Sequence, residues 1–199
     1  MSEPAYTRMQ VDERRQQLLE LGESLFARHS FAELSMAQIA REAGISKALL
    51  YHYFPSKRDY FVATLQAGVQ QLGELTEPDP DLPPLEALSR SVDAFVAWVG
   101  ERDVAYRKLI ASAGEVPEVK AMVDEVRDQT SKRILEGLGV AENPTPKARV
   151  AVRAWLWTMD GAILDWLEHR DISPSELRDV LLGTLAGSLV AADAADLLS

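Results

Sequence analysis

The sequence of 199 residues contains no cysteine, which excludes disulfide bonds and thiolate metal sites. It also lacks an apolar run of the ~18 to 20 residues that would span a bilayer. Its first thirty residues carry charges throughout, without the apolar core of a signal peptide. We therefore expect a soluble protein that resides in the cytoplasm and does not contact a membrane.

The sequence is also poor in the motifs of common enzyme classes. Its three histidines, His29, His52 and His169, are scattered and show no metal-ligand spacing. There is no G-x-S-x-G, no phosphate-binding loop with its lysine and no dinucleotide fingerprint. We expect a protein that is not an enzyme and that binds neither a cofactor nor a metal.

Charge is present but unevenly distributed. The net charge is −10, which by itself argues against a nucleic-acid partner. Residues 1–60, however, hold eight basic and eight acidic side chains, whereas residues 61–199 hold 13 basic and 23 acidic ones. A neutral segment joined to an acidic one indicates two parts with different roles, and only the first part would accept a polyanion.

The sequence pattern is helical throughout and shows no alternation typical of strands. Capping signals and prolines predict an all-α fold of about nine helices, with a three-helix head at residues 1–56 and a larger helical body at 57–199. Apolar residues make up 47% of the chain, enough for a buried core. The predicted helices lie at roughly 11–29, 35–44, 46–54, 57–76, 85–100, 102–113, 117–137, 147–169 and 174–196.

Residues 35–58 show the features of a helix-turn-helix. Ala40 and Ala43 are small enough for two short helices to touch, and Gly44 accepts the positive φ of a tight turn. In this motif the start of the second helix enters the major groove of DNA. The same packing also occurs in ordinary helical proteins, so an all-helical protein-interaction module without DNA binding is the alternative.

The stretch from Gly44 to Lys57 resembles the signature of the tetracycline-repressor (TetR) family, chiefly through Tyr51-His52-Tyr53-Phe54 followed by Ser56-Lys57. The similarity covers roughly residues 11–62, and the rest of the chain resembles the family in length and helical content. The resemblance implies a transcriptional regulator whose head binds a palindromic operator as a homodimer, usually to repress. It also implies that a ligand in the body releases the DNA.

The resemblance also implies which side chains meet the operator. The implied phosphate contacts come from Ser35, Tyr51, His52 and Lys57. The implied contacts near base edges come from Ser46, Lys47, Ala48 and Leu49. The family often has glycine at position 48, where this chain has alanine, and the operator sequence therefore stays open.

The last two predicted helices are apolar on several sides, which favours burial against a second copy over packing within one chain. The side chains expected to form this homodimer interface are Trp157, Leu164, Leu167, Leu181, Leu185 and Leu189.

Aromatic, aliphatic and methionine side chains between the head and that interface are typical of a pocket for a small, largely apolar effector. A plain packed core is the alternative for each of them. The expected lining residues are Phe61, Leu65, Phe95, Trp98, Tyr106, Arg107, Ile110, Met122, Val126, Trp155 and Met159.

Overall fold

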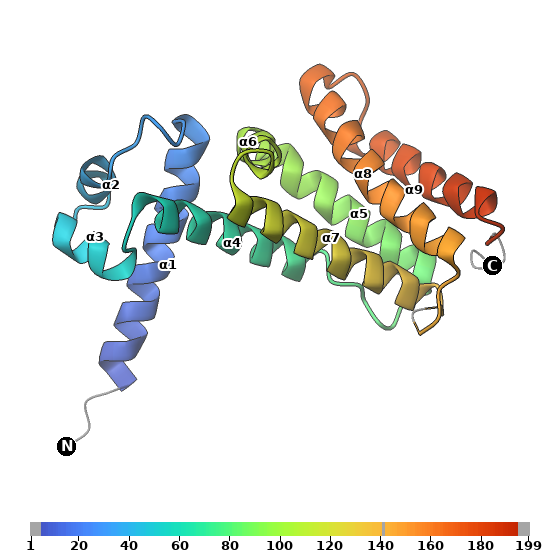
Figure 1. Ribbon diagram of the computed structural model, residues 1–199, viewed down its shortest axis with the longest axis horizontal. Helices are drawn as coiled ribbons and strands as arrows, with labels where there is room; N and C mark the ends of the chain where they lie inside the picture. The colour runs from blue at the N-terminus through green and yellow to red at the C-terminus, as the bar shows by residue number, and fades with distance from the viewer. Residues whose placement is uncertain (1–4, 141, 195–199) are drawn as a thin grey trace.

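The computed structural model describes residues 5–140 and 142–194, and within these ranges the chain forms nine α-helices and no β-strand. The all-α prediction is confirmed. Figure 1 shows α1, α2 and α3 at one end of the molecule, α4 leading away from them, and α8 and α9 at the opposite end. The helices are α1 (Ala5–Arg28), α2 (Met36–Glu42), α3 (Lys47–Tyr53), α4 (Lys57–Leu75), α5 (Pro84–Glu101), α6 (Asp103–Ala113), α7 (Pro117–Gly137), α8 (Pro146–His169) and α9 (Pro174–Ala191).

Most predicted boundaries lie within two residues of the observed ones, and the two exceptions are at the ends of the chain. Helix α1 begins six residues earlier than predicted, because residues 5–10 contain neither proline nor glycine to stop it. Helix α9 ends at Ala191, where the prediction extended it to 196. The backbone turns left-handed at Asp193 (φ 54°), and the Ala194 amide donates back to the Leu189 carbonyl (2.9 Å). Positions 195 and 196 lie outside the described residues.

The buried side chains form two clusters rather than one. The body cluster joins α5, α6, α8 and α9 with the end of α7 and is centred on Trp155, Ile163 and Leu181. The head cluster joins α1, α2 and α3 with the first turns of α4 and α7. Its buried members beyond residue 56 are Tyr60, Phe61, Val119 and Val123.

Helices α1 and α4 approach closely at Gly22. The Tyr60 hydroxyl donates to the Leu18 carbonyl (2.5 Å), and burial raises the pKa of this phenol well above its usual value. The Thr64 hydroxyl donates to the Tyr60 carbonyl (2.8 Å). Both side chains are buried against the backbone of α1, so they fix the angle at which α4 leaves the head.

Residues 5–140 and 142–194 include no helix that is both long enough and apolar enough to cross a membrane.

Candidate nucleic-acid interface

Helices α2 and α3 meet through a tight turn. Gly44 has φ 66°, a conformation that costs glycine nothing, and the Ile45 amide donates to the Ala40 carbonyl (3.0 Å). Ile39 and Leu50 are fully buried beneath this turn. The turn and the two buried side chains hold α3 in one orientation on the head, as a DNA-reading helix requires.

Serine caps begin both helices of the motif. The Ser35 hydroxyl accepts from the Gln38 backbone amide (3.2 Å), and the Gln38 side chain accepts from the Ser35 backbone amide (2.9 Å), which together form a capping box. The Ser46 hydroxyl accepts from the Leu49 amide (3.1 Å) at the start of α3. Both hydroxyls therefore stabilise helix ends while they lie exposed on the head.

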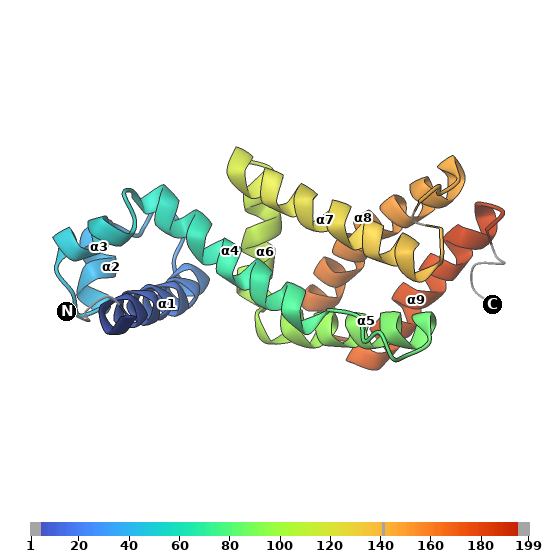
Figure 2. The same cartoon turned by 90° about the horizontal axis from the view of Figure 1, so that it is seen from below.

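The outward side of α3 brings together the side chains expected near base edges. Ser46, Lys47, Ala48 and Leu49 are exposed in succession along its first turn. Leu49 keeps 39% of its surface exposed although it is apolar, and Tyr51 keeps 41%. Figure 2 shows α3 at the end of the molecule, away from the body. Nothing in the described chain covers this helix face.

The side chains expected to contact phosphates differ in their surroundings. Tyr51 and His52 are exposed on α3, and the Lys47 ammonium lies 5.6 Å from the centre of the Tyr51 ring. Lys57 is different, because its ammonium donates to the carbonyls of Phe31 (2.7 Å) and Leu34 (2.8 Å). This lysine thus supports the loop between α1 and α2, a role that no pattern in the sequence indicates.

Lys57→Met is expected to lower the free energy of unfolding by ~1 kcal/mol, because two backbone carbonyls lose a charged donor. For a chain of this length that corresponds to a fall of ~2–4 °C in the melting temperature. Lys47→Met removes the same charge from an exposed side chain and is expected to leave the melting temperature unchanged. Thermal denaturation followed by circular dichroism compares the two, and equal melting temperatures would contradict the supporting role of Lys57.

The residues expected to line an effector pocket are not all in one place. Phe61 and Leu65 belong to the head cluster. Arg107 is paired with Asp103 at 2.5 Å on its own helix. Met122 and Val126 are partly buried on α7. The remaining six pack in or against the body cluster: Phe95, Trp98, Tyr106, Ile110, Trp155 and Met159.

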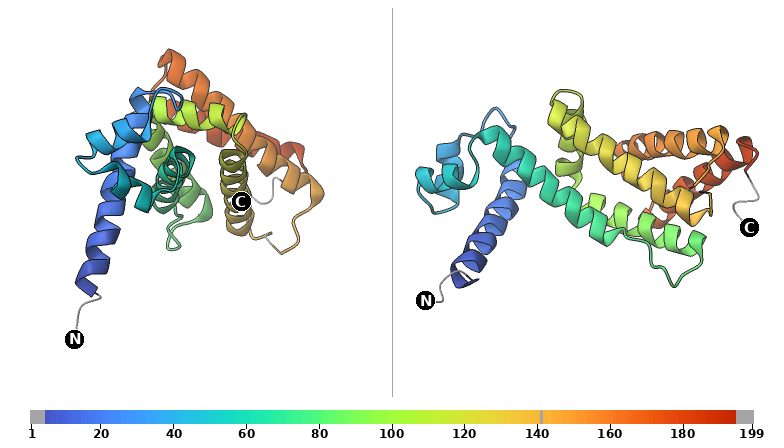
Figure 3. Two further views of the ribbon diagram at one scale, coloured as in Figure 1. Left: turned by 60° about the vertical axis from the view of Figure 1, so that its left-hand side comes forward. Right: turned by 60° about the horizontal axis from the view of Figure 1, so that its bottom comes forward.

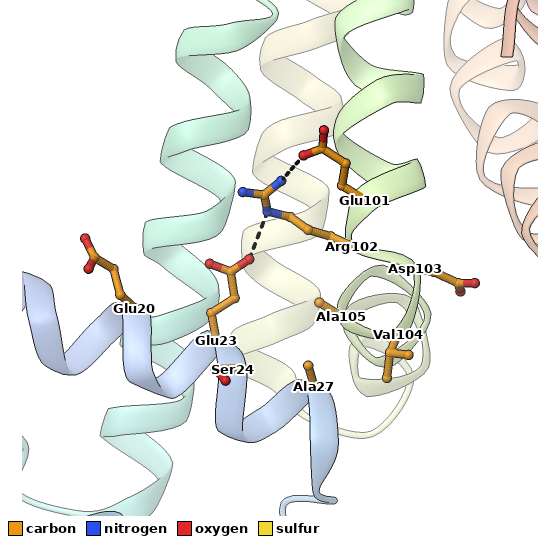
Figure 4. Close-up of a pocket in the computed structure, with 9 residues that line it drawn as sticks. All are labelled: Glu20, Glu23, Ser24, Ala27, Glu101, Arg102, Asp103, Val104 and Ala105. Atoms are coloured by element: carbon orange, nitrogen blue, oxygen red, sulfur yellow. Dashed lines mark hydrogen bonds and ion pairs between the residues drawn. The ribbon is translucent and has the colours of Figure 1, made fainter. Parts of the chain in front are cut away.

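Two hollows on the described residues are lined by none of the expected pocket residues. The larger, about 380 Å³, lies between α1 and the corner where α5 meets α6 (Figure 4). Arg102 reaches across it and pairs with Glu23 of α1 at 2.9 Å. Within residues 5–140 and 142–194, no group of three or more histidine or carboxylate side chains is placed to hold a metal ion.

A polar network links three helices of the body. The Tyr106 hydroxyl of α6 donates to Asp160 of α8 (2.8 Å), whose other carboxylate oxygen pairs with Arg127 of α7. The guanidinium of Arg127 also lies 4.0 Å from the centre of the Trp157 ring. Burial, followed by the Asp160 charge, raises the pKa of Tyr106 well above its usual value. Sequence reasoning missed Arg127, because an arginine on an amphipathic helix resembles any solvated side chain.

The structure corrects most of the expected dimer residues. Leu167, Leu181, Leu185 and Leu189 are buried in the core of their own chain, so in this conformation they offer no surface to a partner. Leu164 packs partly against the same core. Only Trp157 is largely exposed, at 62%.

The exposed faces of the last two helices are lined by small and apolar residues. The face of α8 carries Val150, Ala154, Trp157 and Gly161, and that of α9 carries Val180, Gly183, Gly187 and Val190. Their spacing of three and four residues places each set along one side of its helix.

Two family models match this chain. The model described as "Bacterial regulatory proteins, tetR family" matches residues 18–64, which contain α2, α3 and the turn between them. The model described as "Tetracyclin repressor-like, C-terminal domain" matches residues 84–187, which begin at α5 and end within α9.

Known proteins of similar sequence and structure agree with these matches. The transcriptional regulator MftR of Mycobacterium tuberculosis is 30% identical over 158 residues, covering 76% of this chain and 77% of the relative. The activator FasR of Mycolicibacterium smegmatis is 31% identical over 124 residues, 58% of this chain and 54% of the relative. A TetR-family regulator from Streptomyces coelicolor has a similar structure, with a TM-score of 0.83, 32% identity and coverage of 92% and 83%. The chain therefore belongs to the TetR family of bacterial regulatory proteins and is a DNA-binding transcriptional regulator.

Proposed function

We propose that this regulator is a repressor that binds a palindromic operator as a homodimer and is released from it by a small, largely apolar ligand. The exposed side of α3, held by the Gly44 turn, is the observation that carries this proposal. One α3 reads one half-site, and successive half-sites lie ~34 to 36 Å apart, so two copies are needed to occupy both. Repression is the usual mode of the family, although FasR is named an activator.

The operator contacts follow from the exposed residues of the head. Ser46, Lys47, Ala48 and Leu49 stand at the start of α3, the end that faces base edges in this motif. Ser35, Tyr51, His52 and Lys57 are the proposed phosphate contacts. For Lys57 this contact requires its ammonium to bind a phosphate in addition to the two carbonyls that it already holds.

The homodimer is proposed to form through α8 and α9. Their exposed faces would otherwise leave Trp157, Val180 and Val190 in water, and glycines on both helices allow close approach. Pairing the same two helices from each copy gives a four-helix interface with two-fold symmetry. These helices lie at the far end from α3 (Figure 1), so both heads stay free.

The ligand is proposed to act on the body and thereby on α4. The partly buried Tyr106–Asp160–Arg127 network is the polar group around which a mostly apolar ligand would be oriented. A ligand shifts the protein only if it binds the DNA-free conformation more tightly than the DNA-bound one. A tilt of α4, which runs from the head into the body, would change the separation of the two α3 helices.

The test begins with selection of duplexes from a random pool by the wild-type chain, followed by binding measured by fluorescence anisotropy. A selected palindrome, with affinity that falls steeply as salt rises, is expected because phosphate contacts release counterions. Small aliphatic and aromatic compounds are then screened by thermal shift, where saturation at ~100 times the dissociation constant adds ~2.7 kcal/mol of stability. Failure to select any sequence would contradict operator binding. Compounds that stabilise the protein without releasing the palindrome would contradict the proposed ligand response.

A further inference from the structure

The end of α1 is held by a lysine from the body. The Lys108 ammonium of α6 donates to the carbonyls of Phe26 (2.6 Å), Ala27 (3.0 Å) and His29 (2.9 Å). The last carbonyls of a helix have no partner within it, and a positive charge is favourable at that end. Lys108 thus supplies both the donors and the charge that the end of α1 needs.

All three donors of this ammonium are in use, so its position is fixed relative to α1. Hydrogen bonds from a charged donor are stronger than neutral ones. The bonded residues lie 79 to 82 positions apart in the sequence, and the contact therefore joins head and body directly. Arg102 pairs with Glu23 at 2.9 Å beside it, where α6 begins.

This contact adds to two other connections between the two parts. One is the covalent connection through α4, which crosses from the head to the body (Figure 3) and packs closely on α1 at Gly22. The other is the apolar packing of Val119 and Val123 of α7 in the head cluster. Apolar packing has no preferred direction, so a head held by α4 and these two valines would still be able to pivot about α4. A contact between α6 and the far end of α1 opposes such a pivot, because it acts away from the α4 axis.

Lys108 contributes little to either core. Its side chain is partly buried at the junction, and it belongs to neither apolar cluster. Leu50 and Phe54, which support α3, pack without it. Removal of the ammonium should therefore loosen the head on the body and leave α3 folded.

We infer that Lys108 is a positioning residue for operator binding, which holds the two heads of the homodimer at the spacing of the palindrome without touching DNA. This inference rests on the proposed palindromic, dimeric function. The avidity of two linked sites depends on whether both can bind at once. A loosely held head binds a single half-site with normal affinity. Binding of both heads to the palindrome then costs more free energy, because the second head is no longer held at the required spacing.

The test compares wild type, Lys108→Met and Lys132→Met on two duplexes, the palindrome selected by the wild-type chain and the same duplex with one half-site scrambled. Lys132 is an exposed lysine of α7, and its replacement removes the same charge far from the head. For Lys108→Met we expect unchanged affinity for the single half-site and a ~10-fold loss on the palindrome. Lys132→Met should match wild type on both duplexes.

Hydrogen exchange measured by mass spectrometry adds a readout without DNA. Peptides covering the end of α1 and the following loop should exchange faster in Lys108→Met than in either other protein, because that helix end loses its cap. Peptides covering α3 should exchange equally in all three proteins. If Lys108→Met does not fold, Lys108→Gln, which keeps a donor group, is measured in the same way.

Equal ratios of palindrome to half-site affinity in wild type and Lys108→Met would overturn the role of Lys108 alone. Equal loss on both duplexes would also overturn it, since that result assigns Lys108 to the folding of the head. A wild-type chain without any preference for the palindrome would overturn the proposed function, and this inference with it.

Discussion

Gly22→Ala is expected to destabilise the protein by ~2 kcal/mol, although alanine favours helices. A Cβ atom at this position would lie 2.4 Å from Thr64 Oγ1 and 2.9 Å from the Tyr60 hydroxyl. Neither neighbour can move cheaply, because both are buried and hydrogen-bonded to backbone carbonyls. Helices α1 and α4 must separate instead, so we also expect weaker binding to the operator. Denaturation in urea gives the change in free energy.

Gly73→Ala is the matched control for this substitution. Gly73 also lies within a helix, α4, and a Cβ atom there would meet nothing within 4 Å. The Gly73→Ala substitution should therefore stabilise the chain by ~0.5–1 kcal/mol through helix propensity alone. The double variant Gly22→Ala with Thr64→Ala should lose less than the sum of the single losses. A Gly22→Ala protein as stable as Gly73→Ala would contradict the close packing of α1 on α4.

Val180→Glu should convert the proposed dimer into a monomer. The valine is 52% exposed on α9, in the face proposed to pair with its copy. Two-fold symmetry places the new carboxylate in the interface twice, without a partner in either position. Burying an unpaired charge costs ~3 kcal/mol or more, which corresponds to at least ~100-fold weaker association. Sedimentation should then give 22.0 kDa, the mass of one chain, in place of twice that mass. The affinity for the operator should fall in parallel.

Val104→Glu is the control for charge and exposure. Val104 is 49% exposed, but it lies on α6, where it lines the hollow beside α1 and is not part of the exposed faces of α8 and α9. This variant should sediment like wild type. If Val180→Glu also remained dimeric, the homodimer would have to use another surface.

The local parts of the fold were predictable because their signals are local. Proline at the first position of α9, preceded by the Ser173 cap, defines a helix start without reference to the rest of the chain. The same holds for the Ser35 capping box and the Gly44 turn. These helix starts and this turn were therefore predictable from adjacent residues alone.

The side of each apolar helix that faces the core could not be predicted from the sequence. Helix α8 is apolar nearly all round, so its pattern does not say which side meets the core and which side meets a partner. Leu167 of α8 was assigned to the partner side for this reason, as were Leu181 and Leu185 of the similarly apolar α9, whereas all three pack inside the chain. Lys57 and Lys108 are similar cases, because their carbonyl partners lie more than twenty residues away.

The head cluster has a consequence for how such regulators can exchange their DNA-binding heads. Four of its buried side chains come from α4 and α7, and Val119 is fully enclosed among residues of the head. A gene fusion that exchanged only residues 1–56 would leave Tyr60 and Phe61 facing a foreign surface. Recombination at this point is therefore restricted to bodies whose first turn of α7 already fits the incoming head. The fit between a DNA-binding head and its body thus depends on that one apolar turn as much as on the connecting helix.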